Sequence, residues 1–296
     1  MKRGFLIYNP SAGGRAKTRL QLDDVVKQFA VQQIEIIPCP SKAGGSVIRD
    51  VGELVQEKPD LFVAWGGDGT INEVVNGLFG SGIPLGILPG GTANLMVREL
   101  NIPKNVSSAV RVIGSGNSRR ISVGQANDRY FLLMVGIGFD SAVIQNVSPP
   151  LKRRFGKLAF GISALHTAIQ YQFPAFDVRY NGEETRSVFA IICNARHYAA
   201  YFVLTPDADI SDEFLYVCLF QDPGLARMFL YAFHAFKRTH LKLDSVKIVR
   251  AKEVTVSGSE AIVAQADGEL VGTLPVHFSI HPHSLEVFTP VVRMRS

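Results

Sequence analysis

The sequence predicts an α/β domain with a parallel sheet, followed by a β-rich domain built as an antiparallel sandwich. The first 120 residues alternate strand-like and helix-like stretches, which is typical of a parallel sheet covered by helices. Beyond Arg119 and Arg120, short strands are joined by turn residues such as Asn181-Gly182, a strong hairpin signal. We expect the α/β domain over 1–120, with the tail 284–296 as a candidate to return to it, and the β-rich domain over 121–283.

Composition limits the class of protein. The chain has 296 residues, of which 47% are apolar and 19% charged, so it can bury large cores and wholesale disorder is excluded. No apolar run reaches the roughly 18 residues that a spanning helix needs, and a signal peptide is not predicted. Cys39, Cys193 and Cys218 are widely spaced and are predicted to be reduced thiols, which favours a cytoplasmic protein.

The elements of the α/β domain follow from hydrophobic patterning. The run Leu61-Phe62-Val63-Ala64-Trp65 is unbroken, as expected for a strand that is buried on both faces. The other strands are predicted at 4–8, 34–37 and 85–88, and the helices at 20–29, 47–56, 70–79 and 93–100.

The β-rich domain has short strands and two predicted helical insertions. Strands are predicted at 121–125, 130–135, 176–180, 188–193, 215–220, 246–250, 253–257, 262–266 and 276–280, and helices near 157–171 and 225–236. Phe229, Phe233 and Phe236 in the second helix are expected to be core residues. The spacing Gly136-Ile137-Gly138 is interpreted as a bend.

A glycine-rich turn follows the central strand, in the run Gly66-Gly67-Asp68-Gly69-Thr70. Glycines let the backbone turn sharply and approach a ligand closely. Thr70 and Glu73 fit a capping box, which predicts that the helix begins at Thr70. A glycine turn that leads into a helix N-terminus presents free N–H groups and the positive end of the helix dipole, which favours phosphate binding over an ordinary tight loop.

Similar glycine loops follow two other predicted strands, at 9–14 and 89–94. The carboxyl ends of parallel strands share one sheet edge, where open α/β sheets bind ligands. The sequence contains no G-x-x-x-x-G-K-[ST], HExxH or GxSxG pattern, so P-loop, zincin and hydrolase chemistry are not supported.

These motifs together resemble the diacylglycerol kinase catalytic family, which includes bacterial soluble lipid kinases and the sphingosine and ceramide kinases. The resemblance is carried by Asn9-Pro10-x-x-Gly13, by the GGDGT run with Ile71-Asn72-Glu73, and by Gly91-Thr92-Ala93-Asn94. It continues through 206–213 and through Gln265-Ala266-Asp267-Gly268-Glu269, so it covers nearly the whole chain. The GGDG turn is shared more remotely with NAD kinases and phosphofructokinases.

The resemblance implies an ATP-dependent, Mg²⁺-dependent lipid kinase whose acceptor is a diacylglycerol-like hydroxyl. It implies that Asp267 is the general base for the lipid hydroxyl, and that the carboxylate of Asp212 binds a structural Mg²⁺ with the main-chain carbonyls of Asp209 and Phe214. The residues that it implies for ATP are Asn9, Ser41, Gly66, Gly67, Asp68, Gly69, Thr70, Ile71, Asn72, Glu73 and Thr92. This interpretation requires the glycine-lined edge and Asp267 to face one pocket.

Each acid also has a purely structural interpretation. Asp68, Asp212 and the Asp267-Gly268 pair are all suited to turns. The family has Gly where this chain has Glu213, and Glu would be costly there if the position needs a positive φ. His277, His281 and His283 lack nearby ligands for a metal and are interpreted as packed or solvated histidines.

The net charge of +5 suggests an anionic partner or simple solubility. A basic cluster, Lys152-Arg153-Arg154 with Lys157, precedes an apolar helical segment that either packs in the core or docks on anionic lipid. We expect a peripheral enzyme at an anionic membrane surface, no nucleic-acid partner, and a homodimer as an open possibility. The alternatives are an NAD kinase-like enzyme and a non-catalytic regulator that binds lipid or nucleotide.

Overall fold

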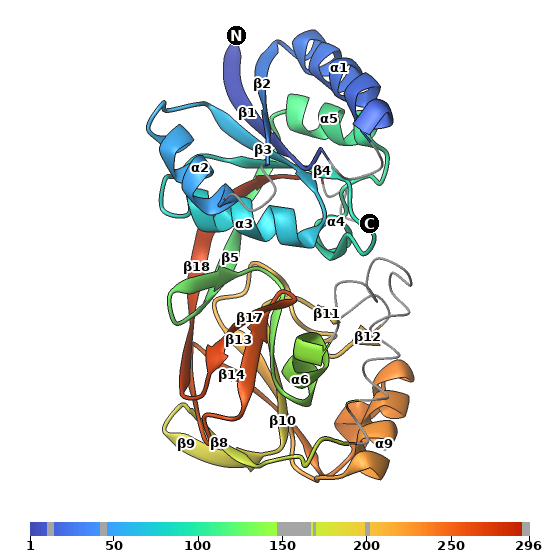
Figure 1. Cartoon of the computed structure of the whole chain (residues 1–296), viewed down its shortest axis with the longest axis vertical. Helices are drawn as coiled ribbons and strands as arrows, with labels where there is room; N and C mark the ends of the chain where they lie inside the picture. Colours follow the sequence, from blue (N-terminus) through green and yellow to red (C-terminus); the bar gives the residue numbers. More distant parts are fainter. Residues whose placement is uncertain (11–14, 42–45, 147–166, 168–169, 199–201, 292–296) are drawn as a thin grey trace. The chain divides into compact units, whose positions relative to one another are not determined.

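The computed structural model describes residues 1–10, 15–41, 46–146, 167, 170–198 and 202–291 (Figure 1). The chain divides into two compact units, which we call unit 1 (1–122 and 283–296) and unit 2 (123–282). It passes from unit 1 into unit 2 within strand β5 (Ser118–Ala126) and returns within β18 (Val276–Phe288). The predicted fold class is confirmed, since unit 1 is an α/β layer structure and unit 2 an antiparallel sandwich.

The sheet of unit 1 is parallel. Its strand order is β2-β1-β3-β4, continued by the end of β18, and each neighbouring pair of strands runs in parallel. The four complete strands are β1 (Lys2–Tyr8), β2 (Ile34–Pro40), β3 (Leu61–Gly66) and β4 (Leu85–Pro89). The side chains of Leu61, Phe62, Val63 and Ala64 are 0% exposed, so β3 is buried on both faces as predicted.

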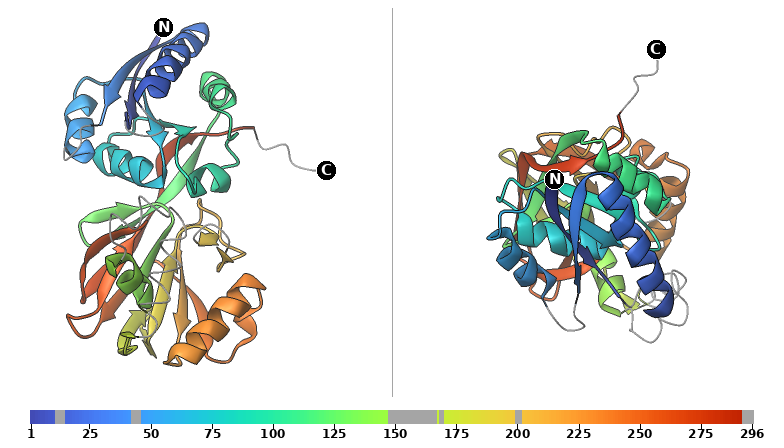
Figure 2. Two further views of the ribbon diagram at one scale, coloured as in Figure 1. Left: turned by 45° about the vertical axis from the view of Figure 1, so that its right-hand side comes forward. Right: turned by 90° about the horizontal axis from the view of Figure 1, so that it is seen from above.

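Helices cover both faces of this sheet. In the view from above in Figure 2, α1 and α5 lie on one side of the strands and α2 on the other. The helices of unit 1 are α1 (Arg15–Val31), α2 (Val47–Val55), α3 (Asp68–Leu78), α4 (Leu95–Glu99) and α5 (Val106–Gly114). Helix α5 was not predicted from the sequence, although Asn105 caps it by accepting the N–H of Ser108 at 3.0 Å.

Unit 2 contains a sheet of antiparallel strands in the order β14-β13-β10-β7-β16-β17. Its strands are β7 (Met134–Gly138), β10 (Phe189–Cys193), β13 (Leu215–Phe220), β14 (Val246–Ala251), β16 (Val263–Ala266) and β17 (Glu269–Thr273). The opposing strands are β15 (Glu253–Ser257), β8 (Phe176–Tyr180) and β9 (Glu183–Ser187) beside β18, with β6 (Arg129–Phe131) paired to β5. A short pair, β11 (His197–Tyr198) and β12 (Phe202–Val203), stands apart from both sheets.

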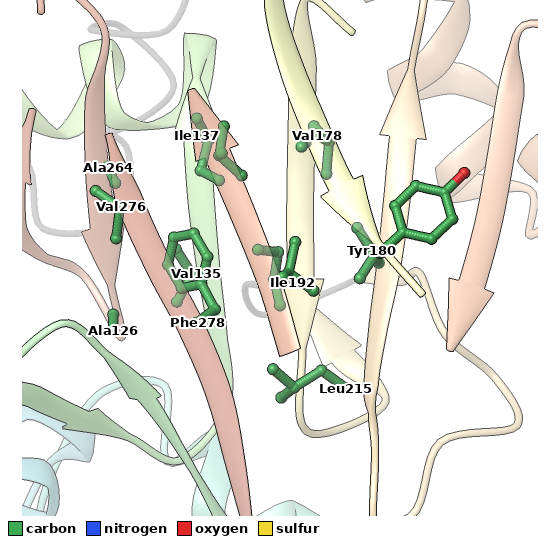
Figure 3. Close-up of a cluster of buried hydrophobic side chains, with 14 of the residues drawn as sticks. Ala126, Val135, Ile137, Val178, Tyr180, Ile192, Leu215, Ala264, Val276 and Phe278 are labelled. Atoms are coloured by element: carbon green, nitrogen blue, oxygen red, sulfur yellow. The ribbon is translucent and has the colours of Figure 1, made fainter. Parts of the chain in front are cut away.

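The core of unit 2 lies between these two sheets (Figure 3). Val135, Ile137 and Ile192 come from the first sheet, while Val178 and Phe278 come from the second, and all five are 0% exposed. Every second residue of a strand faces the same side, so this inward set leaves the intervening residues to the outer faces.

The structure corrects two expectations in unit 2. The segment 130–135 is not one strand: β6 ends at Phe131 and β7 begins at Met134, because the N–H groups between them bind a side chain described below. Phe229, Phe233 and Phe236 are exposed rather than core, because helix α9 (Leu225–Phe236) packs through its other face.

Unit 2 also contains α6 (Phe139–Asn146) and the 3₁₀ turn η1 (His240–Lys242). Gly138 has a φ of +89° where β7 turns into α6, in agreement with the predicted bend. Most of the predicted helix at 157–171, and the basic cluster 152–157, lie outside the described residues. Within the described parts of the chain, every helix is too short or too polar to span a bilayer.

Candidate active site

The glycine turn after β3 leads directly into helix α3. The helix begins at Asp68 with Gly67 as its N-cap, so the prediction that it begins at Thr70 with a capping box was wrong. Thr70 instead lies in the first helical turn against Gly66, where an added Cβ would come within 2.6 Å of the threonine Cβ. The absence of a side chain at Gly66 therefore allows the helix to start two residues earlier. The first N–H groups of α3 lack partners within the helix, as at any N-terminus, and face the loop.

Two glycine loops pack backbone against backbone. The N–H of Gly90 donates to the carbonyl of Gly66 at 3.0 Å. A Cβ on Gly91 would collide with the Cα of Gly67, so the loop after β4 has no room for a side chain at this point, and a Cβ on Gly67 would be tight at 3.2 Å from the Cα of Gly91. The loop after β4 is closed by Asn94, whose side chain accepts the N–H of Gly91 and donates to its carbonyl, both at 2.9 Å. The close approach leaves main-chain groups of both loops at one sheet edge.

Asp68 links these loops. Its Oδ1 accepts the N–H of Met96, in the first turn of α4, at 3.0 Å. The carboxylate therefore holds α4 against α3, which is a positioning role across 28 residues of sequence. Neither the spacing nor the composition of the sequence indicated this bond.

The other residues predicted for ATP differ in their exposure and contacts. Asn9 and Thr92 are exposed and follow β1 and β4, so their side chains lie at the same sheet edge as the α3 N-terminus. Ser41 donates its N–H to the carbonyl of Tyr8 at 2.8 Å, which ties the end of β2 to this edge. Gly69, Thr70 and Glu73 are half-buried. The side chains of Ile71 and Asn72 are 0% and 3% exposed, so these two residues face the interior of unit 1.

Asp267 lies on the turn between β16 and β17, where it has a φ of +48°. Its carboxylate accepts three consecutive main-chain N–H groups: Leu132 at 2.7 Å, and Leu133 and Met134 at 3.0 Å each. Its own N–H donates to the carbonyl of Met134 at 2.9 Å. Consecutive N–H groups that converge in this way form a nest that suits an anionic group, and the three bonds fix the position of the carboxylate.

A second acid, Asp140, supports the Asp267 turn through the side chain of Gln265. The side chain of Gln265 accepts the N–H of Gly268 at 2.8 Å and donates to Asp140 at 2.6 Å. The hydroxyl of Tyr198 donates to the other oxygen of Asp140. Burial raises the pKa of Asp140 above its ordinary value, and the two hydrogen bonds oppose that effect only in part. A Cβ on Gly136 would lie 2.8 Å from the Cγ of Asp140, so this glycine makes room for the carboxyl group.

The residues implied for magnesium lie on a tight turn before β13. Oδ2 of Asp212 accepts the N–H of Asp209 at 2.9 Å and the hydroxyl of Tyr216 at 2.8 Å. Burial, followed by the hydrogen bond to Asp212, raises the pKa of Tyr216 to about 12, so this hydroxyl stays a donor at neutral pH. The carbonyl of Asp209 accepts the N–H of Asp212 at 2.9 Å. A carboxylate and main-chain carbonyls are hard oxygen donors, which fit Mg²⁺.

The described parts of the chain contain no group of three or more His, Cys, Asp or Glu side chains that could hold a metal ion. A magnesium ion at this turn would therefore depend on the main-chain carbonyls beside Asp212. Glu213 does not have a positive φ, so the side chain that replaces the family's glycine does not strain the backbone. His277 and His281 bond to Thr255 at 3.1 Å and Gln125 at 2.5 Å, which agrees with their interpretation as packed or solvated residues.

Unit 2 also contains a cavity of about 220 Å³ beside α6. Ala142 and Val263 give it an apolar part, and Gln145, Asn146 and Tyr171 give it a polar part. A drug-sized ligand usually occupies roughly 300–1,000 Å³. The described lining therefore leaves enough volume for a headgroup or a short piece of chain.

Comparisons with known proteins agree with this arrangement. Residues 3–126 match the family model described as the diacylglycerol kinase catalytic domain, and residues 133–289 match the YegS C-terminal NAD kinase beta sandwich-like domain. A crystal structure of a diacylglycerol kinase from Bacillus anthracis str. Sterne superposes with a TM-score of 0.79 and 25% identity, over 98% of this chain and 97% of that one.

Curated relatives are similar over nearly their whole length. A diacylglycerol kinase of Staphylococcus carnosus is 30% identical over 293 residues, which are 98% of this chain and 95% of the relative. A diacylglycerol kinase of Bacillus subtilis is 29% identical over 283 residues, which are 94% and 93% of the two chains. The matched residues extend through both units. The chain therefore belongs to the diacylglycerol kinase family, a family of lipid kinases.

Proposed function

We propose that this protein transfers the γ-phosphate of ATP to the hydroxyl group of a diacylglycerol-like lipid. The relatives from Staphylococcus carnosus and Bacillus subtilis carry the name diacylglycerol kinase, which makes diacylglycerol the first acceptor to test. The observation that carries the proposal is the Asp267 carboxylate, held on a partly exposed turn by three N–H groups.

Nucleotide binding is assigned to the glycine loops of unit 1. The N–H groups at the start of α3 and the positive end of its dipole suit phosphate oxygens. The backbone contact between Gly67 and Gly91 brings a second loop to the same edge. Thr92 and Asn9 are exposed there and offer side chains to the phosphates or the ribose. Asp68 supports this site by holding α4, through Met96.

Asp267 is assigned the role of general base, which accepts or orients the proton of the lipid hydroxyl. Its three N–H donors hold the side chain in one place, and a fixed acceptor lowers the cost of orienting the hydroxyl. The network of Gln265 and Asp140 keeps the turn that carries it in position. Phosphoryl transfer depends mainly on such positioning and on electrostatic stabilisation.

Magnesium is assigned to Asp212 with the carbonyls of Asp209 and Phe214. The donor set is of the right chemical type, and Tyr216 orients the carboxylate. A bound Mg²⁺ would neutralise local negative charge and order the turn before β13. We further propose that the protein works in the cytoplasm at the membrane periphery, because its acceptor is a lipid.

A second candidate is phosphorylation of NAD. It is favoured by the model matched over 133–289, which is described as NAD kinase beta sandwich-like. The two functions differ in the acceptor, since NAD is soluble and polar whereas diacylglycerol is neither.

The test is an acceptor panel. The purified chain is incubated with ATP, Mg²⁺ and one acceptor in each reaction. The acceptors are diacylglycerol, phosphatidylglycerol, a sphingoid base, a prenyl alcohol and NAD, and mass spectrometry detects the gain of one phosphate. We expect phosphorylation of diacylglycerol and none of NAD. Transfer to NAD alone would replace the proposal by its rival, and no transfer to any acceptor, with intact ATP binding, would favour a non-catalytic regulator.

A further inference from the structure

Helix α9 presents an aromatic face to solvent. Phe229, Phe233 and Phe236 are 57%, 53% and 68% exposed, and Leu241 in the following 3₁₀ turn is 42% exposed. The spacings of four and three residues place the three phenylalanines on one side of the helix. In the described part of the chain, no other phenylalanine is exposed. Figure 1 and the left view of Figure 2 place α9 at the periphery of unit 2.

The opposite face of α9 is firmly anchored. Met228, Tyr231 and Ala235 are buried, and the ring of Tyr231 lies 4.9 Å from that of Phe220 in β13. The Tyr231 hydroxyl accepts the N–H of Asp222 at 3.1 Å and donates to Ser245 at 3.0 Å. The aromatic face is therefore displayed by a helix that is packed and hydrogen-bonded on its inner side.

The surroundings of this face are basic. Between Asp222 and Asp244 the chain has four Lys or Arg residues and only those two acidic residues, and Asp222 pairs with Arg227 at 3.3 Å. Helix α9 itself contains no Asp or Glu. Lys237 holds its ammonium group 4.6 Å from the centre of the Phe233 ring. An aromatic face rimmed by Lys and Arg complements a surface that is apolar inside and negatively charged at its boundary.

A second copy of the chain fits this face less well. A phenylalanine can bury roughly 150–250 Å², so the exposed parts of three rings amount to about 350 Å². A stable protein interface buries about 800 Å² on each partner. We propose that the face formed by Phe229, Phe233, Phe236 and Leu241 docks on the surface of an anionic lipid bilayer, assisted by Lys237 beside Phe233 and by the exposed Arg238 and Lys242 that follow in the chain. This inference builds on the proposed function, which requires access to a membrane-embedded acceptor.

The test measures binding to vesicles without ATP. Wild-type protein and the triple variant Phe229→Ser/Phe233→Ser/Phe236→Ser are sedimented with vesicles of phosphatidylcholine and phosphatidylglycerol. We expect the bound fraction of the variant to fall about tenfold, because the rings supply most of the apolar contact. Val31→Ser/Val291→Ser is the matched control, since Val31 and Val291 are exposed apolar residues of unit 1. Equal binding by wild type and triple variant would overturn the proposal.

Charge and insertion are tested separately. Lys237→Glu/Lys242→Glu should weaken binding to anionic vesicles and remove the preference over pure phosphatidylcholine, whereas Lys27→Glu/Lys104→Glu should change neither. Phe233→Trp should show a blue-shifted emission, quenched by brominated lipid, when anionic vesicles are added. The proposal would be overturned if vesicles left the emission of Phe233→Trp unchanged. It would also be overturned if wild type were a dimer that does not bind vesicles and the triple variant were a monomer.

Kinase activity distinguishes this proposal from the one on which it builds. The triple variant should phosphorylate dihexanoylglycerol in dilute solution as wild type does, and lose activity on diacylglycerol in vesicles. If wild type binds vesicles but phosphorylates no lipid, the lipid-kinase proposal is overturned and the docking face is supported. Equal activity of the triple variant and wild type on diacylglycerol in vesicles would overturn the docking face and leave the lipid-kinase proposal intact.

Discussion

The glycine loops of unit 1 and the Asp267 turn of unit 2 are built in different ways. The loops depend on neighbours in sequence and on contacts across 24 to 28 residues, such as the bond from the N–H of Gly90 to the carbonyl of Gly66. The carboxylate of Asp267 instead depends on N–H groups 133 to 135 residues earlier in the chain. A backbone site can therefore arise from local sequence, while an oriented carboxylate requires the finished tertiary structure. Substitutions in the two regions should fail in correspondingly different ways.

The largest effect is expected for Asp267→Ala. Loss of a general base lowers turnover by about 10²–10⁴-fold. The same change leaves three N–H groups without their acceptor, and each unsatisfied buried group costs about 1–3 kcal/mol. We therefore expect slow turnover and also a lower free energy of unfolding, with ATP affinity unchanged because the glycine loops belong to unit 1. Turnover is measured by phosphate transfer to diacylglycerol, and stability by urea unfolding.

The matched control is Asp128→Ala. Asp128 is an exposed turn acid of unit 2, and its replacement should alter neither turnover nor stability by much. Asp267→Asn narrows the difference between the two effects. Asparagine tolerates the left-handed backbone of this position and its one amide oxygen can keep part of the N–H bonds, but it cannot act as a base. Turnover of the asparagine variant close to that of wild type would remove Asp267 from the base role.

The local features of the site could be predicted from the sequence, whereas the long-range ones could not. The four central strands of unit 1 and the glycine loops follow from apolar runs and glycine spacing. Asp267-Gly268 reads only as a hairpin turn, and its assignment came from family resemblance, because no pattern reports which N–H groups a side chain will meet. The network of Asp140, Gln265 and Tyr198 joins three segments that are distant in the sequence. No sequence pattern predicts it, because Gly136, which makes room for Asp140, is part of a spacing that indicates only a bend. The exposed side of α9 could not be distinguished from a buried one, because apolar spacing identifies a face and not its partner.

The next largest effect is expected for Gly91→Ala. Its Cβ would have no room against Gly67 and would lie 2.8 Å from the side chain of Asn94, so the two loops must separate. We expect ATP affinity to fall by about tenfold or more and stability by about 1–3 kcal/mol, the usual cost of overpacking. Calorimetric titration with ATP measures the affinity.

Gly52→Ala is the control for this substitution. Gly52 lies within α2, and its only near neighbour for a new Cβ is the carbonyl of Gly77 at 3.8 Å. Alanine in a helix interior should raise the free energy of unfolding by about 0.5–1 kcal/mol without affecting ATP. Equal ATP affinity in the Gly91 and Gly52 variants would show that contact between the loops does not shape the nucleotide site.

A smaller and pH-dependent effect is expected for Asp140→Asn. Burial raises the pKa of Asp140 in the folded protein, so the folded state holds the proton more tightly than the unfolded chain. Its contribution to stability is therefore full at a pH below the ordinary carboxyl pKa of about 4, and it is lost as the pH rises through the raised folded-state value. The asparagine variant lacks this dependence and can keep hydrogen bonds to Tyr198 and Gln265.

The measurement is the difference in unfolding free energy between wild type and Asp140→Asn, followed by urea unfolding from about pH 4 upwards. This difference should shift in favour of the variant as the pH rises. Asp128→Asn makes the same chemical change at an exposed position and should give a difference that is nearly constant. A constant difference for Asp140→Asn would mean that the carboxyl group is not buried in solution.

The smallest effect is expected for Glu213→Gly, which restores the residue that the family has beside Asp212. The backbone of Glu213 lacks a positive φ, so glycine relieves no strain there and increases the freedom of the unfolded chain. Glu213 and Lys252 approach to 3.8 Å, and both side chains are more than half exposed, so this ion pair adds little. We expect a loss of about 0.5 kcal/mol or less and an unchanged Mg²⁺ requirement in the kinase assay. A lower Mg²⁺ requirement in the glycine variant would instead show that the glutamate side chain disturbs the metal turn.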